Sequence, residues 1–393
     1  MTPLPTARLL QLVPLLAALA TAAHAAPLQV SSGGRNSLGP SLSADGSRLA
    51  FYSASDLTGG NADNNFEVFL YDRGPAQMRQ ISNLPGGQFA GGNQTPSLSG
   101  DGGRLVFQHF ESSGGYSYYQ TQSYDLASNT LTTLTPLGYF ESSAISRDGR
   151  VIAVSTGNLG VRLYDTSTQT FSGVVMPAVD VSMSGDGSRL AYASFSQSVR
   201  LLDVTSDTTT IVSPAGGGYN QNPVLSADGN SIAFVSSFDP LGQNGDGNAE
   251  LFRYDVPTQT LIQVTHTGGA SASLSASISG DGSRIAFSSS ADLTGGNADG
   301  NYEVFVYDLL AGSFQQLTDT LGGVFSGDAQ LSEDGLTLAY VSNMNINGGN
   351  PYGGIQVFMD TLAPQVGRAL PEPATLALVL GTLALLPALR RAR

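Results

Sequence analysis

One short phrase recurs seven times along the chain and constrains the fold more than any other feature. Each copy contains a serine, one variable residue, an Asp-Gly pair and then an apolar run typical of a β-strand, as in SISGDGSRIAF from Ser277. Asp-Gly supplies the positive φ that a tight hairpin turn needs. The copies recur about every 40 to 55 residues, and a β-type repeat of that period indicates a blade array. The seven turn aspartates are Asp45, Asp101, Asp148, Asp186, Asp228, Asp281 and Asp334.

Each repeat is predicted to form four antiparallel strands. In the sixth copy, Ser277–Ser279 and Arg284–Phe287 flank the Asp-Gly turn. Tyr302–Asp308 then alternates with the period of a pleated strand, and Ser313–Thr318 follows after an aspartate that favours a turn. Four such strands make one blade of a β-propeller.

The end of the last repeat indicates how the ring closes. After Asp360 the chain has no convincing fourth strand, whereas residues 28–32 resemble the fourth strands of the other repeats. An N-terminal strand in that place removes an exposed sheet edge. We therefore predict an all-β, seven-bladed β-propeller of four-stranded antiparallel blades over residues 26–362, closed by the N-terminal strand.

The N-terminal residues 1–25 have the pattern of a helical secretory signal peptide. Arg8 precedes the apolar stretch Leu9–Ala20, and Ala23-His24-Ala25 is a small-x-small cleavage site. A retained membrane anchor is the alternative, although twelve apolar residues are short for a membrane span.

The C-terminal residues have an order of their own. A linker, residues 363–373, ends in Pro371-Glu372-Pro373, and residues 374–393 form an apolar, helical segment followed by a basic tail. The tail resembles the PEP-CTERM sorting signal of Gram-negative bacteria. The resemblance implies processing by an exosortase after signal peptidase, with transient residence in the inner membrane. An ordinary single-span anchor is the alternative, and the basic tail places the propeller outside the membrane in both cases.

Composition limits the classes of molecule that the protein is expected to bind. Charged residues make up 12% of the chain, and the net charge is −14. All the basic residues are arginines, and there is no cysteine, which excludes disulfides and thiolate chemistry. An acidic, lysine-free surface argues against nucleic acid and anionic lipid as partners. It is compatible with divalent cations.

The loop between the second and third strands carries oxygen ligands at alternate positions in three repeats. Hard cations such as Ca²⁺ prefer this kind of ligand, and the first half of an EF-hand loop uses the same spacing. Turn capping by Asn and Asp explains the same pattern without a metal, so both interpretations stay open. The candidate calcium ligands are Asn61, Asp63, Asn65, Glu67, Asn244, Asp246, Asn248, Glu250, Asn297, Asp299, Asn301 and Glu303.

Other polar and aromatic residues give weaker signals. Tyr116, Tyr118 and Tyr119 lie in a predicted loop of the second repeat, where they either bind a ligand or fill space between blades. The arginines after the turns are expected to pair with neighbouring acids, and turn geometry already accounts for the turn aspartates. His109 and His266 are the histidines of the mature chain, and no motif of hydrolytic catalysis accompanies them.

The repeats, SxSxDG followed by an EVFxYD-type strand, resemble the TolB-like propeller repeats, a WD-type family. The resemblance covers about residues 28–360 and implies a closed propeller that serves as a docking platform. Some relatives of this propeller carry a hydrolase domain, for which these residues offer no counterpart, so we do not expect their peptidase activity to carry over.

We expect an exported, non-enzymatic and monomeric binding or scaffold module in the periplasm, on the outer surface or in the extracellular matrix, with a protein or exopolysaccharide partner. The alternative is a calcium-dependent propeller enzyme of the lactonase or lyase type, with its site at the channel mouth.

Overall fold

The computed structural model describes residues 26–365, apart from 85–90, 114–115, 139–141, 156–159, 176–177, 195, 215, 217, 270 and 347. The predicted signal peptide, most of the predicted linker and the C-terminal segment lie outside the described residues. Within the described part, no helix is both long enough and apolar enough to cross a lipid bilayer.

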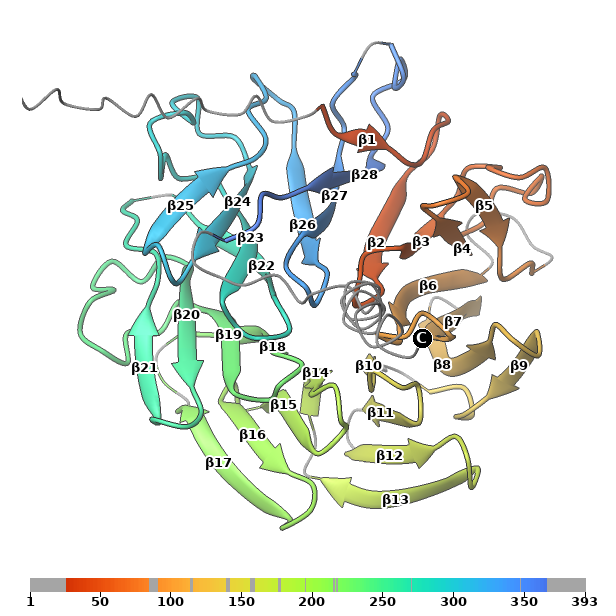
Figure 1. The fold of residues 1–393 in the computed structure, drawn as a ribbon, viewed down its shortest axis with the longest axis horizontal. Coiled ribbons are helices and arrows are strands. Elements are labelled where there is room, and N and C mark those ends of the chain that lie inside the picture. The colour runs from red at the N-terminus through yellow and green to blue at the C-terminus, as the bar shows by residue number, and fades with distance from the viewer. Residues whose placement is uncertain are drawn as a thin grey trace, which may run out of the picture.

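Seven four-stranded antiparallel sheets surround one axis, as Figure 1 shows. The prediction of an all-β, seven-bladed propeller is confirmed. Blades one to four are β2 (Ser37–Leu42), β3 (Arg48–Ser53), β4 (Glu67–Asp72) and β5 (Gln77–Gln80); β6 (Gly91–Leu98), β7 (Arg104–Ser113), β8 (Tyr116–Asp125) and β9 (Thr130–Thr133); β10 (Ser142–Ile145), β11 (Val151–Ser155), β12 (Val161–Asp165) and β13 (Thr170–Val175); and β14 (Ala178–Met183), β15 (Arg189–Ser194), β16 (Val199–Asp203) and β17 (Thr208–Ser213).

The last three blades repeat this plan, and the seventh takes its outermost strand from the N-terminus. Leu28 pairs with Met359, and Gln29 pairs with Phe358. This confirms the predicted ring closure. Blades five to seven are β18 (Asn220–Leu225), β19 (Ser231–Ser236), β20 (Glu250–Asp255) and β21 (Thr260–Gln263); β22 (Ser273–Ile278), β23 (Arg284–Ser289), β24 (Glu303–Asp308) and β25 (Ser313–Gln316); and β26 (Ser326–Leu331), β27 (Thr337–Ser342), β28 (Gln356–Thr361) and β1 (Leu28–Gln29).

The hydrophobic core lies between neighbouring blades. The second and third strands of a blade place stacked aromatic pairs across the sheet, such as Phe287 and Phe305 with ring centroids 5.9 Å apart. The side chains of these strands then pack on the next blade, as Val304 and Val306 of blade six do on Leu338 of blade seven. The apolar runs of the repeat phrase therefore hold the ring together.

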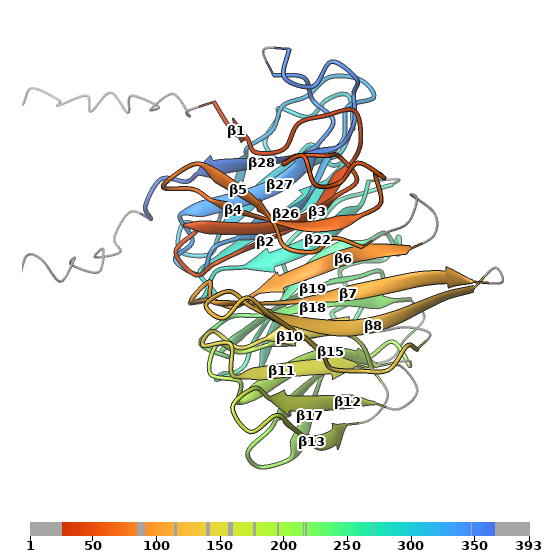
Figure 2. The ribbon, with the colours of Figure 1, turned by 90° about the vertical axis from the view of Figure 1, so that its right-hand side faces the viewer.

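Two faces of the ring differ in structure. We call the face with the Asp-Gly turns the turn face, and the opposite face, with the loops between second and third strands, the loop face. On the loop face the β7–β8 hairpin projects beyond the other strands (Figure 2). This corrects one prediction, because the three tyrosines of repeat two lie on β8 and not in a loop. Their β-propensity allows Arg104–Asp125 to pair as one long hairpin.

Candidate functional site

The turn aspartates have a structural role at the turn face. Asp45 accepts hydrogen bonds through Oδ1 from the Ser43 hydroxyl at 2.8 Å and from the Ser47 backbone N–H at 2.9 Å. Partial burial opposes the charge of Asp45, but these hydrogen bonds outweigh it and lower its pKa. The glycine that follows, Gly46, has φ of 65°, as the turn requires. The same arrangement holds the turn in the other blades.

A ring of seven backbone hydrogen bonds joins these turns around the axis. Each N–H donates to a carbonyl of the next blade over 2.8 to 3.0 Å, so that the last bond returns to blade one. The donor of each bond is the variable residue before the turn aspartate or the aspartate itself, and the acceptor is the variable residue of the next blade. The donor and acceptor pairs are Ala44 to Gly100, Asp101 to Arg147, Arg147 to Gly185, Gly185 to Ala227, Asp228 to Gly280, Gly280 to Glu333, and Asp334 to Ala44.

Two of the variable residues carry charged side chains, and these meet across the axis. Arg147 of blade three forms an ion pair with Glu333 of blade seven, whereas the other five blades have Gly or Ala at this position. The pair lines a cavity of about 780 Å³ at the turn face. This cavity shares no lining residue with the channel cavity described next.

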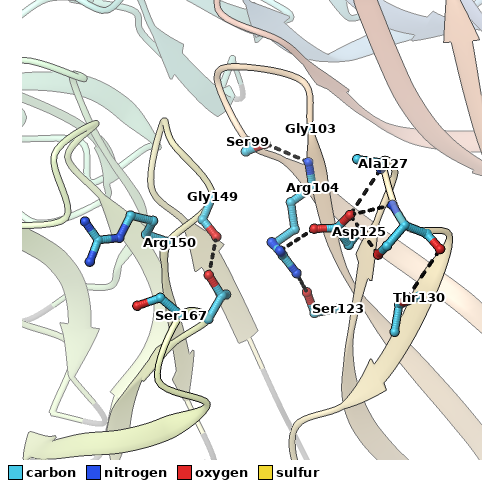
Figure 3. A network of polar contacts seen from close by, with 12 residues as sticks. Ser99, Gly103, Arg104, Ser123, Asp125, Ala127, Thr130, Gly149, Arg150 and Ser167 are labelled. Carbon is cyan, nitrogen blue, oxygen red and sulfur yellow. Dashed lines mark hydrogen bonds and ion pairs between the residues drawn. The ribbon is translucent and has the colours of Figure 1, made fainter.

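The arginines after the turns tie the blades together. In Figure 3, Arg104 forms an ion pair with Asp125 at the end of the third strand. The backbone N–H groups of Ala127 and Ser128, in the turn that follows this strand, donate to the same carboxylate. Arg48 and Arg284 form the equivalent pairs with Asp72 and Asp308, as predicted. These ion pairs lie within one blade, and the links between blades are hydrogen bonds: Arg189 donates to the Gly229 carbonyl of the next blade at 2.8 Å, and Arg48 and Arg284 donate likewise to the carbonyls of Gly102 and Gly335.

A cavity of about 510 Å³ lies in the central channel, on the loop-face side. Every blade contributes to its wall the residue six positions before the turn aspartate. We call these seven residues the channel ring: Gly39, Thr95, Ser142, Asp180, Asn222, Ser275 and Asp328.

Six members of the channel ring have left-handed backbone conformations. The φ values are between 44° and 59° in all blades except the third, and five of the six residues are not glycine. Each of the six marks a β-bulge, because the pairing of the first and second strands shifts register there. Positive φ is a genuine outlier for a β-branched residue such as Thr95. Outliers of this kind gather at functional sites, where the rest of the structure maintains them.

The channel ring is acidic on two sides. Burial raises the pKa of Asp180 and of Asp328, although a backbone N–H donates to each, from Asn222 and Gly39 respectively. Tyr52 also lines the cavity, and burial together with the charge of Asp328 raises its pKa to about 12. A Cβ at Gly39 would lie 2.6 Å from the Tyr52 ring, so blade one needs glycine at this position.

The predicted calcium ligands lie on the loop face, but none of them lines either channel cavity. The carboxylates of Glu67, Glu250 and Glu303 are buried at the end of the fourth strand. Glu67, for example, accepts hydrogen bonds from Ser82, from the Leu84 N–H at 2.6 Å and from Asn93. These contacts explain why a glutamate opens the third strand in three blades.

The other loop residues cap the same loop. Asn61 donates from its side chain to the Asn65 carbonyl, and Asp299 accepts the Gly322 N–H at 2.9 Å. Six amide oxygens of the predicted ligand set have no hydrogen-bond donor among the described residues. Among the described residues, nothing donates to the buried amide oxygens of Asn61, Asn65, Asn244, Asn248, Asn297 and Asn301. No three histidine, aspartate or glutamate side chains of the described chain gather as metal ligands would.

The three predicted ligand-binding tyrosines differ in position. Tyr119 lines a side pocket of about 240 Å³ together with Thr95, Ser142 and Asp180, which also belong to the channel ring. Tyr116 is exposed at the end of the hairpin, and Tyr118 lies beside it on β8. The structure therefore brings Tyr119 to a side pocket that adjoins the channel cavity.

The two histidines lie apart from this site. His109 is buried on β7 with Nε2 3.2 Å from Glu111, and His266 is exposed after the fourth strand of blade five. Neither lines the channel cavity.

Comparison with known proteins adds evidence on the fold. No family model and no curated protein matches the chain. The β-propeller domain of the Trilobed protease from Pyrococcus furiosus matches 86% of this chain over 100% of its own length, with 12% identity and a TM-score of 0.59. The chain is a seven-bladed β-propeller. That domain is described as having an open velcro topology, whereas β1 closes this ring.

A second similar structure comes from a study of two prolyl endopeptidases. It matches 86% of this chain with 11% identity and a TM-score of 0.57. This chain spans 51% of that chain's length. Both likenesses concern the propeller fold.

Sequence reasoning missed the channel ring, although the sequence carries a signal for it. Alignment of the seven copies on the turn aspartate places a small or polar residue at the sixth position before it, and proline follows in three copies. The positive φ at this position breaks the strand alternation. The predicted inner strands therefore began too late to include it.

Proposed function

We propose that this chain is an exported, non-enzymatic binding propeller whose ligand occupies the channel cavity from the loop face. Its place of action is the cell envelope or extracellular matrix of a Gram-negative bacterium. The partner is a protein or an exopolysaccharide that inserts one of its groups into the channel. The observation that carries the binding proposal is the channel ring, where five non-glycine residues have positive φ around a polar cavity.

The difference between the two faces supports entry of the ligand from the loop face. The ion pair of Arg147 and Glu333 spans the turn-face end of the axis, where it and residues of the backbone ring line the cavity of about 780 Å³. The loop face instead presents the long hairpin and the side pocket with Tyr119, which adjoins the channel ring. A ligand that enters there meets the variable loops, which differ most between blades.

The export part of the proposal rests on sequence patterns. Residues 1–25 support cleavage by signal peptidase, and residues 371–393 support sorting by an exosortase from the inner membrane. The resemblance to TolB-like repeats supports a docking role. Mass spectrometry of the mature protein tests this part. We expect a start near Ala26 and an end near Pro371-Glu372-Pro373, and an uncleaved C-terminus would favour the membrane anchor.

Two tryptophan substitutions test the channel site. Gln330 lines the channel cavity, whereas Gln315 is exposed on the outermost strand of blade six. A panel of peptides, oligosaccharides and amines is screened by thermal shift on the wild-type protein. We expect Gln330→Trp to reduce the binding of a hit at least tenfold and Gln315→Trp to leave it within twofold. Equal binding by both variants would place the site elsewhere.

The placement of the Asn/Asp loops favours a binding module over the calcium-dependent enzyme. An enzyme of the lactonase or lyase type would need those loops at the channel mouth, next to the reacting carboxylates. Their side chains instead contact their own blade and the connection that follows it. A screen of lactone and uronide substrates tests this alternative, and turnover that disappears in Asp328→Asn would support the enzyme.

Calcium binding by the loops stays a separate proposal, supported by the six buried amide oxygens that have no hydrogen-bond partner among the described residues. Amide oxygens suit calcium, and a buried oxygen without a donor is costly. A calcium-dependent rise in melting temperature that Asp299→Ala reduces would support an ion in blade six. An identical melting temperature with calcium and with chelator would remove the proposal.

A further inference from the structure

The charges of the channel cavity indicate which chemical class of ligand it accepts. Asp180 and Asp328 are the charged members of the channel ring. No arginine or histidine is among the described residues that line the cavity, and no ion pair involves either aspartate in the described part of the chain. Each carboxylate receives a backbone N–H, which leaves further acceptor positions for a ligand.

The two carboxylates face the cavity from distant blades. Asp180 belongs to blade four and Asp328 to blade seven, and three steps is the largest separation in a ring of seven. One metal ion cannot contact carboxylates on opposite walls at the 2.3–2.6 Å that calcium requires. A longer ligand with a cationic group at each end can reach both walls.

The wall near Asp328 adds a second polar group. Tyr52 lines the same cavity, and its phenol group is close enough to Asp328 for the aspartate's charge to affect its ionisation. An ammonium group has three donors and no acceptor, so it can donate to a carboxylate and a phenol oxygen together. The Asp180 wall offers Ser142 and Asn222, which also lie in the ring.

We propose that the channel cavity binds an organic ligand with two separated amino or guanidinium groups, one held by Asp180 and the other by Asp328. The proposal rests on the proposed function, because it assumes that the channel cavity is the binding site. Free diamines and the paired basic side chains of a peptide share this chemistry. A net charge of −14 on the chain also attracts such cations over a distance.

The test is isothermal titration calorimetry at low salt with four probes: 1,4-diaminobutane, 1,8-diaminooctane, the neutral 1,8-octanediol, and a Lys-Gly-Lys peptide with blocked ends. We expect the diamines or the peptide to bind and the diol not to bind. Binding of a diamine alone indicates a free small molecule as the source, and tighter binding of the peptide indicates basic side chains.

Three isosteric variants locate the contacts. We expect Asp180→Asn and Asp328→Asn each to weaken binding at least tenfold. Asp207→Asn, at an exposed turn of blade four, should change it less than twofold. Melting temperatures no lower than that of the wild type would show that the asparagine variants fold. Unchanged diamine binding in the Asp180→Asn/Asp328→Asn double variant, or no binding of any cationic probe, would overturn the proposal.

The same data separate this proposal from the proposed function. If a neutral oligosaccharide binds and Gln330→Trp blocks it, the channel site stands and the cationic ligand is wrong. If diamines bind but Gln330→Trp has no effect, both proposals fail.

Discussion

Arg147 and Glu333 form an ion pair across the turn-face end of the channel, although they lie three blades apart around the ring. The Arg147 side chain is 57% exposed and that of Glu333 is 22% exposed. Burial raises the pKa of Glu333, and the nearby Arg147 opposes that rise. At the same repeat position, the other blades have residues without a charged side chain.

Arg147→Ala is expected to lower the free energy of unfolding by no more than about 1 kcal/mol, since exposed ion pairs contribute little. The backbone hydrogen bonds of the ring remain in this variant. Urea denaturation of Arg147→Ala, Glu333→Gln and the double variant gives the coupling energy. A coupling above about 3 kcal/mol would show that the pair supports the fold itself.

Glu67→Ala is expected to be far more harmful, because it removes an acceptor shared by two buried donors and one partly buried donor. Ser82, the Leu84 N–H and Asn93 all donate to this carboxylate. A buried donor left without a partner costs about 1–3 kcal/mol, so we expect a loss of at least about 3 kcal/mol. Denaturant melts of Glu67→Ala and of the exposed Glu111→Ala provide the comparison. A similar small change in both variants would refute the structural role of Glu67.

Thr95→Gly is expected to stabilise the protein by about 0.5–1 kcal/mol, because glycine adopts a positive φ without strain. Thr130→Gly, in the regular strand β9, is expected to destabilise by a similar amount. Thermal unfolding of the two variants tests the strain directly. Destabilisation by both substitutions would mean that Thr95 is not strained.

Stability is expected to fall steeply below about pH 4. Hydrogen bonds from Thr258 outweigh the opposing effect of burial and lower the pKa of Asp255, and hydrogen bonds from Ser206 lower the pKa of Asp203. A depressed pKa in the folded state gives stability above the unfolded value near 3.9, and this stability is lost as the pH falls. Asp255→Asn should therefore flatten the acid limb of the urea midpoint against pH.

The opposite sign applies to Asp328, whose pKa burial raises. Its folded state prefers the proton, so stability declines as the pH rises from about 4 through the raised pKa. Asp328→Asn should remove this decline and increase stability at pH 7. Curves parallel to that of the wild type would contradict the assignment.

Much of the fold could be predicted because each copy of the repeat phrase specifies its turn and strands through residues that are neighbours in sequence. Asp-Gly at Asp281 needs no distant partner to form a turn, and Leu28–Gln29 could be assigned to the last blade by counting strands. The charged pair of Arg147 and Glu333 could not be predicted, because their proximity depends on the closure of seven blades.

The candidate site was harder to predict for a physical reason. Asp180 and Asp328 look unremarkable in their own repeats, since neighbours in sequence do not show that a bulge turns them toward the channel. The Asn/Asp loops are a candidate cation site by sequence because their composition suits a cation. The hydrogen bonds of Glu67 to Ser82, after the fourth strand, and to Asn93, on the first strand of the next blade, join residues 15 and 26 positions apart, beyond the reach of a local pattern.

Fluorescence can show directly whether a ligand occupies the channel cavity. The chain has no tryptophan, so Tyr52→Trp and Tyr116→Trp each carry a single reporter, one on the channel wall and one at the hairpin end. A molecule that stabilises the wild-type protein is titrated into both variants. We expect a saturable change in emission from Tyr52→Trp and none from Tyr116→Trp. A response of Tyr116→Trp alone would contradict this expectation and assign binding to the hairpin.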